Sequence, residues 1–145
     1  MQVESLQDIP PLVPLIKSSE TGKPYLAGSK CKSCGHVFAG ERQVCANCTA
    51  RDEMLPVHLA ETGKLYVYTV VHRTFPGVKT PFIDAIADLD DGSHLKGTLL
   101  GIAAYDTALA FDMPVKIIYQ EVRPVDASGA PYLTYAFAPA YIKEN

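Results

Sequence analysis

Hydrophobic and polar side chains alternate with a period of two through most of the chain after Pro56. Residues 82–89 are the clearest case, because an apolar side chain occupies every second position there. Successive side chains of a β-strand point to opposite faces of the sheet, so this alternation predicts strands with one buried face. The strands expected on this basis cover residues 65–74, 82–89, 94–100, 115–122 and 132–137.

The connections between these strands carry turn signals. Asp90, Asp91 and Gly92 form the Asp-Gly sequence that is typical of a β-hairpin turn. Residues 106–111 (D-T-A-L-A-F) predict one or two turns of helix between the third and fourth strands. Five strands with a helix in that position follow the order of an OB-fold, a five-stranded Greek-key barrel. We therefore expect a mainly β protein in which residues 57–145 form an OB-fold domain.

The N-terminal segment, residues 1–24, has a different character. Three prolines within residues 10–14 exclude a regular helix there. A short helix is expected to begin near Pro14 and to run towards Glu20, where a Thr-Gly pair ends it. Because the segment is too apolar to float free, this short helical arm is expected to pack on its own domain or on a partner.

All four cysteines lie close together as two C-x-x-C pairs, Cys31 with Cys34 and Cys45 with Cys48. Two such turns can close a tetrahedron of thiolates around one metal ion, and four thiolates without an open position are typical of structural zinc. Iron in a rubredoxin-like centre uses the same ligands and remains an alternative. Two disulfides are a further alternative, but they require an oxidising compartment.

Short apolar stretches lie before and after the first cysteine pair, at residues 25–27 and 37–39. Two short strands around a C-x-x-C turn indicate a rubredoxin-like zinc ribbon, which we place at residues 25–56. A module of this size has too little core to fold alone, so the expected Zn²⁺ has a structural role.

Composition narrows the possible functions. The formal net charge is −3, which argues against a protein that binds a phosphate backbone. No apolar run approaches the ~20 residues that a membrane-spanning helix needs. The first residues lack the basic head and apolar run of a secretory signal, so we expect a cytoplasmic protein.

Several stretches resemble a known family. They are C-K-S-C-G-H-V-F with V-C-A-N-C, G-K-L-Y-V-Y-T-V-V-H-R with the following P-G, A-D-L-D-D-G, D-M-P-V-K-I-I-Y and A-F-A-P-A, and they span residues 25–140. The chain is similar to the zinc-ribbon/OB-fold family of small acyl-CoA-associated proteins, long catalogued only as a domain of unknown function. The Phe-Trp pair that the family's helical arm usually carries is absent, since this chain has no Trp.

The resemblance implies a non-catalytic accessory or scaffold subunit of an acyl-CoA-processing complex. Members of this family work beside thiolase-like acyltransferase, aldolase or CoA-condensing enzymes. The implied partner is a thiolase-like or ketosynthase-type enzyme subunit in a hetero-oligomer, with acyl-CoA as a further possible contact. No set of catalytic residues is recognisable in the sequence, so none is assigned.

The end of the first long strand is the candidate contact region. His72 and Arg73 end that strand, Phe75 opens the Phe-Pro-Gly break, and Lys79 follows it. Arg73 can hold a phosphate of CoA through two hydrogen bonds, and Lys79 can add positive charge. These four residues are the candidate acyl-CoA or partner contacts. The competing interpretation is that His72 and Arg73 are ordinary strand residues with local partners.

A nucleic-acid-binding module is the alternative function, because tyrosines of an OB barrel can stack on single-stranded bases. Tyr66 and Tyr68 are the residues that would do so. The acidic net charge speaks against this interpretation.

Overall fold

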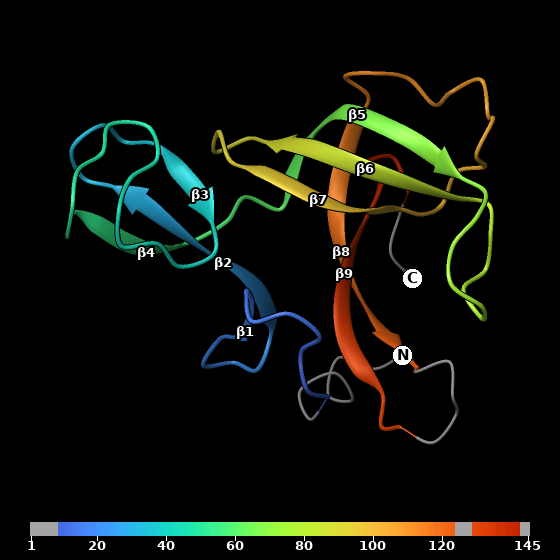
Figure 1. The fold of residues 1–145 in the computed structure, drawn as a ribbon, viewed down its shortest axis with the longest axis horizontal. Coiled ribbons are helices and arrows are strands. Elements are labelled where there is room, and N and C mark those ends of the chain that lie inside the picture. Colours follow the sequence, from blue (N-terminus) through green and yellow to red (C-terminus); the bar gives the residue numbers. More distant parts are fainter. Residues whose placement is uncertain (1–8, 124–128, 143–145) are drawn as a thin grey trace.

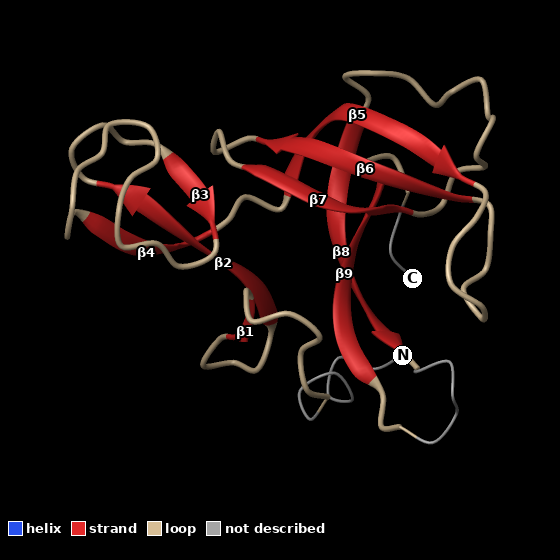
Figure 2. Ribbon diagram, viewed as in Figure 1, coloured by secondary structure: helices blue, strands red, loops and turns tan. Residues whose placement is uncertain are grey.

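The computed structural model describes residues 9–123 and 129–142 as an all-β chain (Figures 1 and 2). These residues form nine strands and no helix. The strands are β1 (Ile16–Ser18), β2 (Pro24–Cys31), β3 (Val37–Ala39), β4 (Met54–His58), β5 (Thr62–Val71), β6 (Phe82–Leu89), β7 (His94–Leu99), β8 (Pro114–Val122) and β9 (Tyr132–Pro139). In the described part of the chain, no helix is long and apolar enough to span a membrane.

Strands β1–β4 form a four-stranded antiparallel sheet around β2, hereafter the ribbon sheet. The start of β2 pairs with β1, and its second half lies between β3 and β4. In the middle of β2, the buried hydroxyl of Ser29 donates to the Gly40 carbonyl at 2.8 Å and accepts from the Arg42 amide at 3.1 Å. Both bonds satisfy the buried hydroxyl and hold the loop after β3 against β2.

Strands β5–β9 close into a barrel in the order β5-β6-β7-β9-β8. All neighbours are antiparallel except β7 and β9, which meet in parallel at Leu99 and Phe137. This is the strand order of an OB-fold, as the period-two pattern predicted for this part of the chain. Along β6, buried and half-buried side chains alternate without interruption, because one face of the strand lines the barrel interior.

A β-bulge in β5 breaks the same alternation. Leu65 pairs with Ala87 and Val67 pairs with Ile86, so one residue of β5 has no counterpart on β6. A regular strand would place Leu65 and Tyr68 on opposite faces. With the bulge between them, Leu65 is fully buried and Tyr68 packs against the same core.

A single hydrophobic cluster joins the ribbon sheet to the barrel. Leu26 and Val37 of the ribbon sheet belong to it, together with Leu59, which follows β4. Phe137 of β9 is the largest fully buried side chain of the barrel. The two sheets therefore share part of their core.

The predicted helical arm is wrong. Residues 12–15 form bends and a turn, and residues 16–18 are strand β1. Further upstream, Pro11 pairs in parallel with Leu133 of β9, and the Leu12 amide donates to the Leu133 carbonyl at 2.8 Å. Prolines cannot donate the hydrogen bonds of a helix, whereas β2 and β9 offer free backbone partners to an extended chain. Residues 1–8 of the expected arm lie outside the described residues.

The helix expected at residues 106–111 is also absent, and this segment is a loop with turns at residues 107–108 and at residue 111. The Asp106 carboxylate accepts the Ala108 amide at 2.8 Å, and the Asp106 carbonyl accepts the Leu109 amide at 3.1 Å. An Asp side chain that bonds the backbone two residues ahead favours a turn over a helix.

Candidate metal centre and barrel-rim surface

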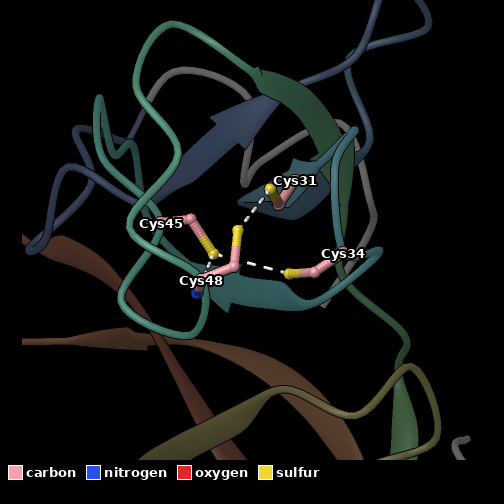
Figure 3. A group of neighbouring side chains, drawn as sticks. All are labelled: Cys31, Cys34, Cys45 and Cys48. Atoms are coloured by element: carbon pink, nitrogen blue, oxygen red, sulfur yellow. Dashed lines mark hydrogen bonds between the residues drawn. The ribbon is translucent and has the colours of Figure 1, made fainter.

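The four cysteines come together at one end of the ribbon sheet (Figure 3). Cys31 ends β2 and Cys34 follows it in the turn before β3, while Cys45 and Cys48 lie in the loop between β3 and β4. Their sulfur atoms all lie within 4.8 Å of one another. The Cys31 and Cys48 sulfurs are 3.7 Å apart, and those of Cys34 and Cys45 are 3.6 Å apart.

These separations suit a shared metal ion. A tetrahedral ion with metal–sulfur bonds of about 2.3 Å requires sulfur atoms about 3.8 Å apart. A disulfide requires about 2.05 Å, and all four cysteines are free thiols. Cys31 and Cys45 are fully buried, whereas Cys34 and Cys48 are accessible. The arrangement can therefore bind a metal through four sulfurs without leaving an open coordination position.

Local backbone geometry shapes each of the two cysteine turns. Gly35 has a φ of 80° just after the first pair, and its amide donates to the Cys31 carbonyl at 2.8 Å. Thr49 has a φ of 65° just after the second pair, and its amide donates to the Cys45 carbonyl at 2.9 Å. Glycine adopts this left-handed region freely, while Thr49 is an uncommon occupant whose conformation the surrounding turn must impose.

Asn47 contacts the cluster from inside the second pair. Its side-chain amide donates to the Cys34 sulfur at 3.4 Å. This bond is the main cause that lowers the pKa of Cys34 to about 6, and a backbone hydrogen bond from His36 adds to it. The hydrogen bond with the Ala50 backbone lowers the pKa of Cys48, but partial desolvation of its sulfur and the neighbouring thiols together raise this pKa to about 11. Asn47 thus favours the thiolate form of Cys34, which is the form that binds metal. In the sequence, the only sign of this role was the position of Asn47 between two cysteines.

His36 and Arg42 lie near the cysteine cluster without joining it. The His36 ring packs on Phe38 with centroids 4.6 Å apart, and the Arg42 guanidinium lies 4.7 Å from the centre of the same ring. Both side chains therefore cover Phe38, which is consistent with four cysteines as the complete ligand set.

The four residues of the candidate contact region lie in the loop between β5 and β6, hereafter the rim loop (residues 72–81). All four are exposed, and Phe75 is 83% exposed. His72 Nε2 lies 2.6 Å from the Tyr105 hydroxyl, with the two rings stacked. Within the described residues, Arg73 and Lys79 form no ion pair. Both cations are thus available to a ligand or partner.

Two aromatic residues that the sequence did not single out extend this surface. Tyr105 is 74% exposed and Phe111 is 66% exposed, and both belong to the loop between β7 and β8. Phe111 packs on Tyr68 of β5, with ring centroids 5.5 Å apart. The contacts with His72 and Tyr68 hold this loop beside the end of β5. In the sequence, the only sign of this role was that two aromatic residues lie close together in a stretch without a strand pattern.

Comparisons with known proteins agree with this architecture. Residues 56–120 match the family described as "ChsH2, C-terminal OB-fold domain". The benzoylsuccinyl-CoA thiolase subunit BbsA of Geobacter metallireducens is 31% identical over 117 residues, which cover 80% of this chain and 75% of BbsA. A DUF35 domain-containing scaffold protein of Methanocaldococcus jannaschii is 28% identical over 117 residues, 79% of this chain and 81% of that protein.

A solved structure has a similar fold. The structure of the Ltp2-ChsH2(DUF35) aldolase superimposes with a TM-score of 0.63 at 27% identity, over 80% of this chain and 85% of that one. The sequence and structural similarities extend across both the cysteine-bearing sheet and the barrel, and on this basis the chain belongs to the DUF35 family of OB-fold proteins.

Proposed function

We propose that this chain is a non-catalytic accessory subunit of a thiolase-like enzyme complex that processes an acyl-CoA. The observation that carries the proposal is the 31% identity to BbsA, a subunit of benzoylsuccinyl-CoA thiolase, over 80% of this chain. The M. jannaschii relative is a scaffold protein, and the structural neighbour is an aldolase that contains a DUF35 chain. The partner is a thiolase-like or ketosynthase-type subunit, in a hetero-oligomer.

We assign a separate role to each of the three parts of the chain. An arm (residues 1–24) and a ribbon (residues 25–56) precede the OB domain (residues 57–145). Cys31, Cys34, Cys45 and Cys48 hold one Zn²⁺, which supplies folding free energy to the ribbon and takes no part in a reaction. Four free thiols suit a reducing compartment, so the cytoplasm is the proposed location.

The rim loop provides the contact surface. Phe75 offers a large exposed apolar side chain, and exposed aromatic residues are the usual anchors of protein interfaces. Arg73 and Lys79 offer charge to a phosphate of acyl-CoA or to acidic residues of the partner. His72, held by Tyr105, fixes the direction in which the loop leaves β5.

Affinity purification of the chain from its native host, with metal analysis of the same sample, tests this function. The expected result is a thiolase-like subunit in fixed stoichiometry and one zinc per chain. Phe75→Ala should weaken retention of that subunit about tenfold or more, as expected for an aromatic anchor. Leu55→Ala is the matched control, because Leu55 is also exposed but lies on β4 of the ribbon sheet.

Two outcomes would contradict the proposal. If no thiolase-like protein is retained and no such enzyme changes its activity when the chain is added, the accessory role is wrong. If Leu55→Ala weakens retention as much as Phe75→Ala does, the rim loop is not the contact surface. Iron in place of zinc would identify a rubredoxin-like centre instead.

A further inference from the structure

The chain passes from the ribbon sheet to the barrel within three residues. The Leu59 amide donates to the Leu26 carbonyl of β2 at 2.9 Å, so Leu59 still belongs to the ribbon sheet. The Glu61 carbonyl accepts the Ile117 amide of β8 at 2.8 Å, so Glu61 already belongs to the barrel. Ala60 lies between them. Its backbone amide bonds to neither sheet and donates instead to a side chain, Asp91 Oδ2, at 2.7 Å.

Asp91 belongs to the turn that joins β6 to β7. In Figure 1 this turn points from the barrel towards the ribbon sheet, and β3 lies next to β7. The two carboxylate oxygens of Asp91 have separate partners. Oδ1 accepts the amide of Ser93 at 2.9 Å and its hydroxyl at 2.5 Å, both within the turn. Oδ2 alone reaches across to Ala60.

Ser93 makes the position of the carboxylate rigid. The Ser93 side chain is fully buried, and both of its donors hold Oδ1. With Oδ1 fixed, Oδ2 is directed at the linker. Because an ionised carboxylate carries a negative charge, its hydrogen bonds are stronger than those of a neutral acceptor, and this applies to the bonds that Asp91 accepts.

We propose that the Asp91 carboxylate is the positioning group that makes the connection between the ribbon sheet and the barrel rigid where their shared hydrophobic cluster joins them, through its Oδ2 bond to the Ala60 amide. The neighbouring Asp90 has a different role. Its carboxylate accepts the Thr62 hydroxyl and its amide donates to the Thr62 carbonyl, and both bonds stay inside the barrel. The two adjacent carboxylates of this turn therefore have different partners: Asp91 binds the linker between the two sheets, and Asp90 binds a strand of the barrel.

Asp91→Asn separates the two functions of the side chain. The amide oxygen keeps the position of Oδ1, because Ser93 directs two donors at it. The new NH₂ group then replaces Oδ2 and faces the Ala60 N–H, donor against donor. The turn is retained and only the bond to the linker is lost. Asp90→Asn is the matched control, since it makes the same charge change one residue away without touching the linker.

The experiment is ¹⁵N relaxation on the full-length, zinc-loaded chain. In the wild type and in Asp90→Asn, amides of the ribbon sheet and of the barrel should share one rotational correlation time. In Asp91→Asn, the ribbon amides should tumble faster than the barrel amides. Hydrogen exchange at Ala60 should accelerate roughly tenfold or more, where each factor of ten corresponds to about 1.4 kcal/mol.

The proposed role of Asp91 is refuted if Asp91→Asn keeps one correlation time and a protected Ala60 amide, or if Asp90→Asn behaves in the same way as Asp91→Asn. If Asp91→Asn does not fold, hydrogen exchange of the wild type decides. The amides of Ala60 and Ser93 should then exchange with the same free energy of opening at each denaturant concentration. Unprotected exchange at the Ala60 amide would refute the proposed role of Asp91.

The biological consequence rests on the proposed accessory function. A rigid connection to the ribbon sheet fixes the orientation of the barrel that carries the rim loop, so Asp91→Asn should retain less of the thiolase-like subunit than Asp90→Asn does. The relaxation measurement needs no partner. A wild-type chain that retains no partner would refute the proposed function, and only the tumbling and exchange results would refute the proposed role of Asp91.

Discussion

Removal of the metal ion by a chelator is expected to unfold the ribbon sheet and to leave the barrel folded. The ribbon has few large buried apolar side chains of its own, chiefly Ile16, Leu26, Val37 and Leu59. Complete burial of four such side chains contributes about 6–12 kcal/mol. Structural zinc in small peptides contributes about 10–16 kcal/mol. The metal therefore outweighs the apolar contribution, and the ribbon should not remain ordered without it.

The barrel has an independent source of stability. Its interior holds Leu65, Val115 and Phe137, each 1% exposed or less, and its strands pair with one another around a closed circuit. None of these contacts involves a cysteine. Loss of the ribbon exposes the part of the core that the two sheets share, so the barrel should become less stable while remaining folded.

Residue-resolved hydrogen exchange before and after chelation is the appropriate assay, with the released metal quantified in the same sample. Amides of β2 to β4 should lose protection in step with metal release, and amides of β5 to β9 should keep it. Addition of Zn²⁺ should restore the original pattern. The reasoning is refuted if the ribbon amides stay protected after the metal has left, or if both sheets unfold in one transition.

Three further results are expected. Phe137→Ala should lower the free energy of unfolding in urea by about 3–5 kcal/mol, because Phe137 is completely buried where β7 meets β9. A decrease below about 1 kcal/mol would contradict this packing. Tyr119→Phe should be neutral or stabilising by up to about 1 kcal/mol, because the buried Tyr119 hydroxyl has no hydrogen-bond partner among the residues that the structure describes. A clear loss of stability would reveal a partner. Burial raises the pKa of Asp91, but hydrogen bonds from Ser93 and Ala60 outweigh it and hold this pKa below its ordinary value of 3.8. The contribution of Asp91 to the free energy of unfolding should therefore be complete above pH 3.8. It should disappear as the pH falls through the lower pKa of the folded state. Acid titrations monitored by urea unfolding should show this loss in the wild type and not in Asp91→Asn.

Local signals in the sequence were sufficient to predict the cysteine cluster and most of the barrel. The two C-x-x-C pairs need only short turns to bring four sulfurs together, and Gly35 has the positive φ that such a turn requires. The Asp-Gly turn before Ser93 is equally local, with Gly92 at a φ of 89°. In these places the chemistry of a few neighbouring residues fixes the backbone, whatever the rest of the chain does.

The prediction of a helical arm failed because a distant segment decides its conformation, whereas the helix expected at residues 106–111 is replaced by the local turn at Asp106. The described part of the N-terminal arm is not helical, because Leu133, more than a hundred residues away, forms backbone hydrogen bonds with Pro10 and Leu12. No local pattern encodes that partner. The bulge between Leu65 and Val67 is also invisible in a strand of uniformly high β-propensity, because it appears only as a mismatch with β6. The same limitation hid the pairing of His72 with Tyr105.

The positions of the cysteine cluster and the rim loop restrict how metal-site variants can be interpreted. The cysteine turns lie on the ribbon sheet, at the opposite end of the molecule from the rim loop in Figure 1. An ion held by four cysteines at that end has no contact with a ligand at Phe75. A cysteine variant that loses its partner would therefore report the unfolding of the ribbon, and not the loss of a catalytic ion. Only a variant that preserves the metal, such as Phe75→Ala, can separate binding at the rim from the integrity of the ribbon.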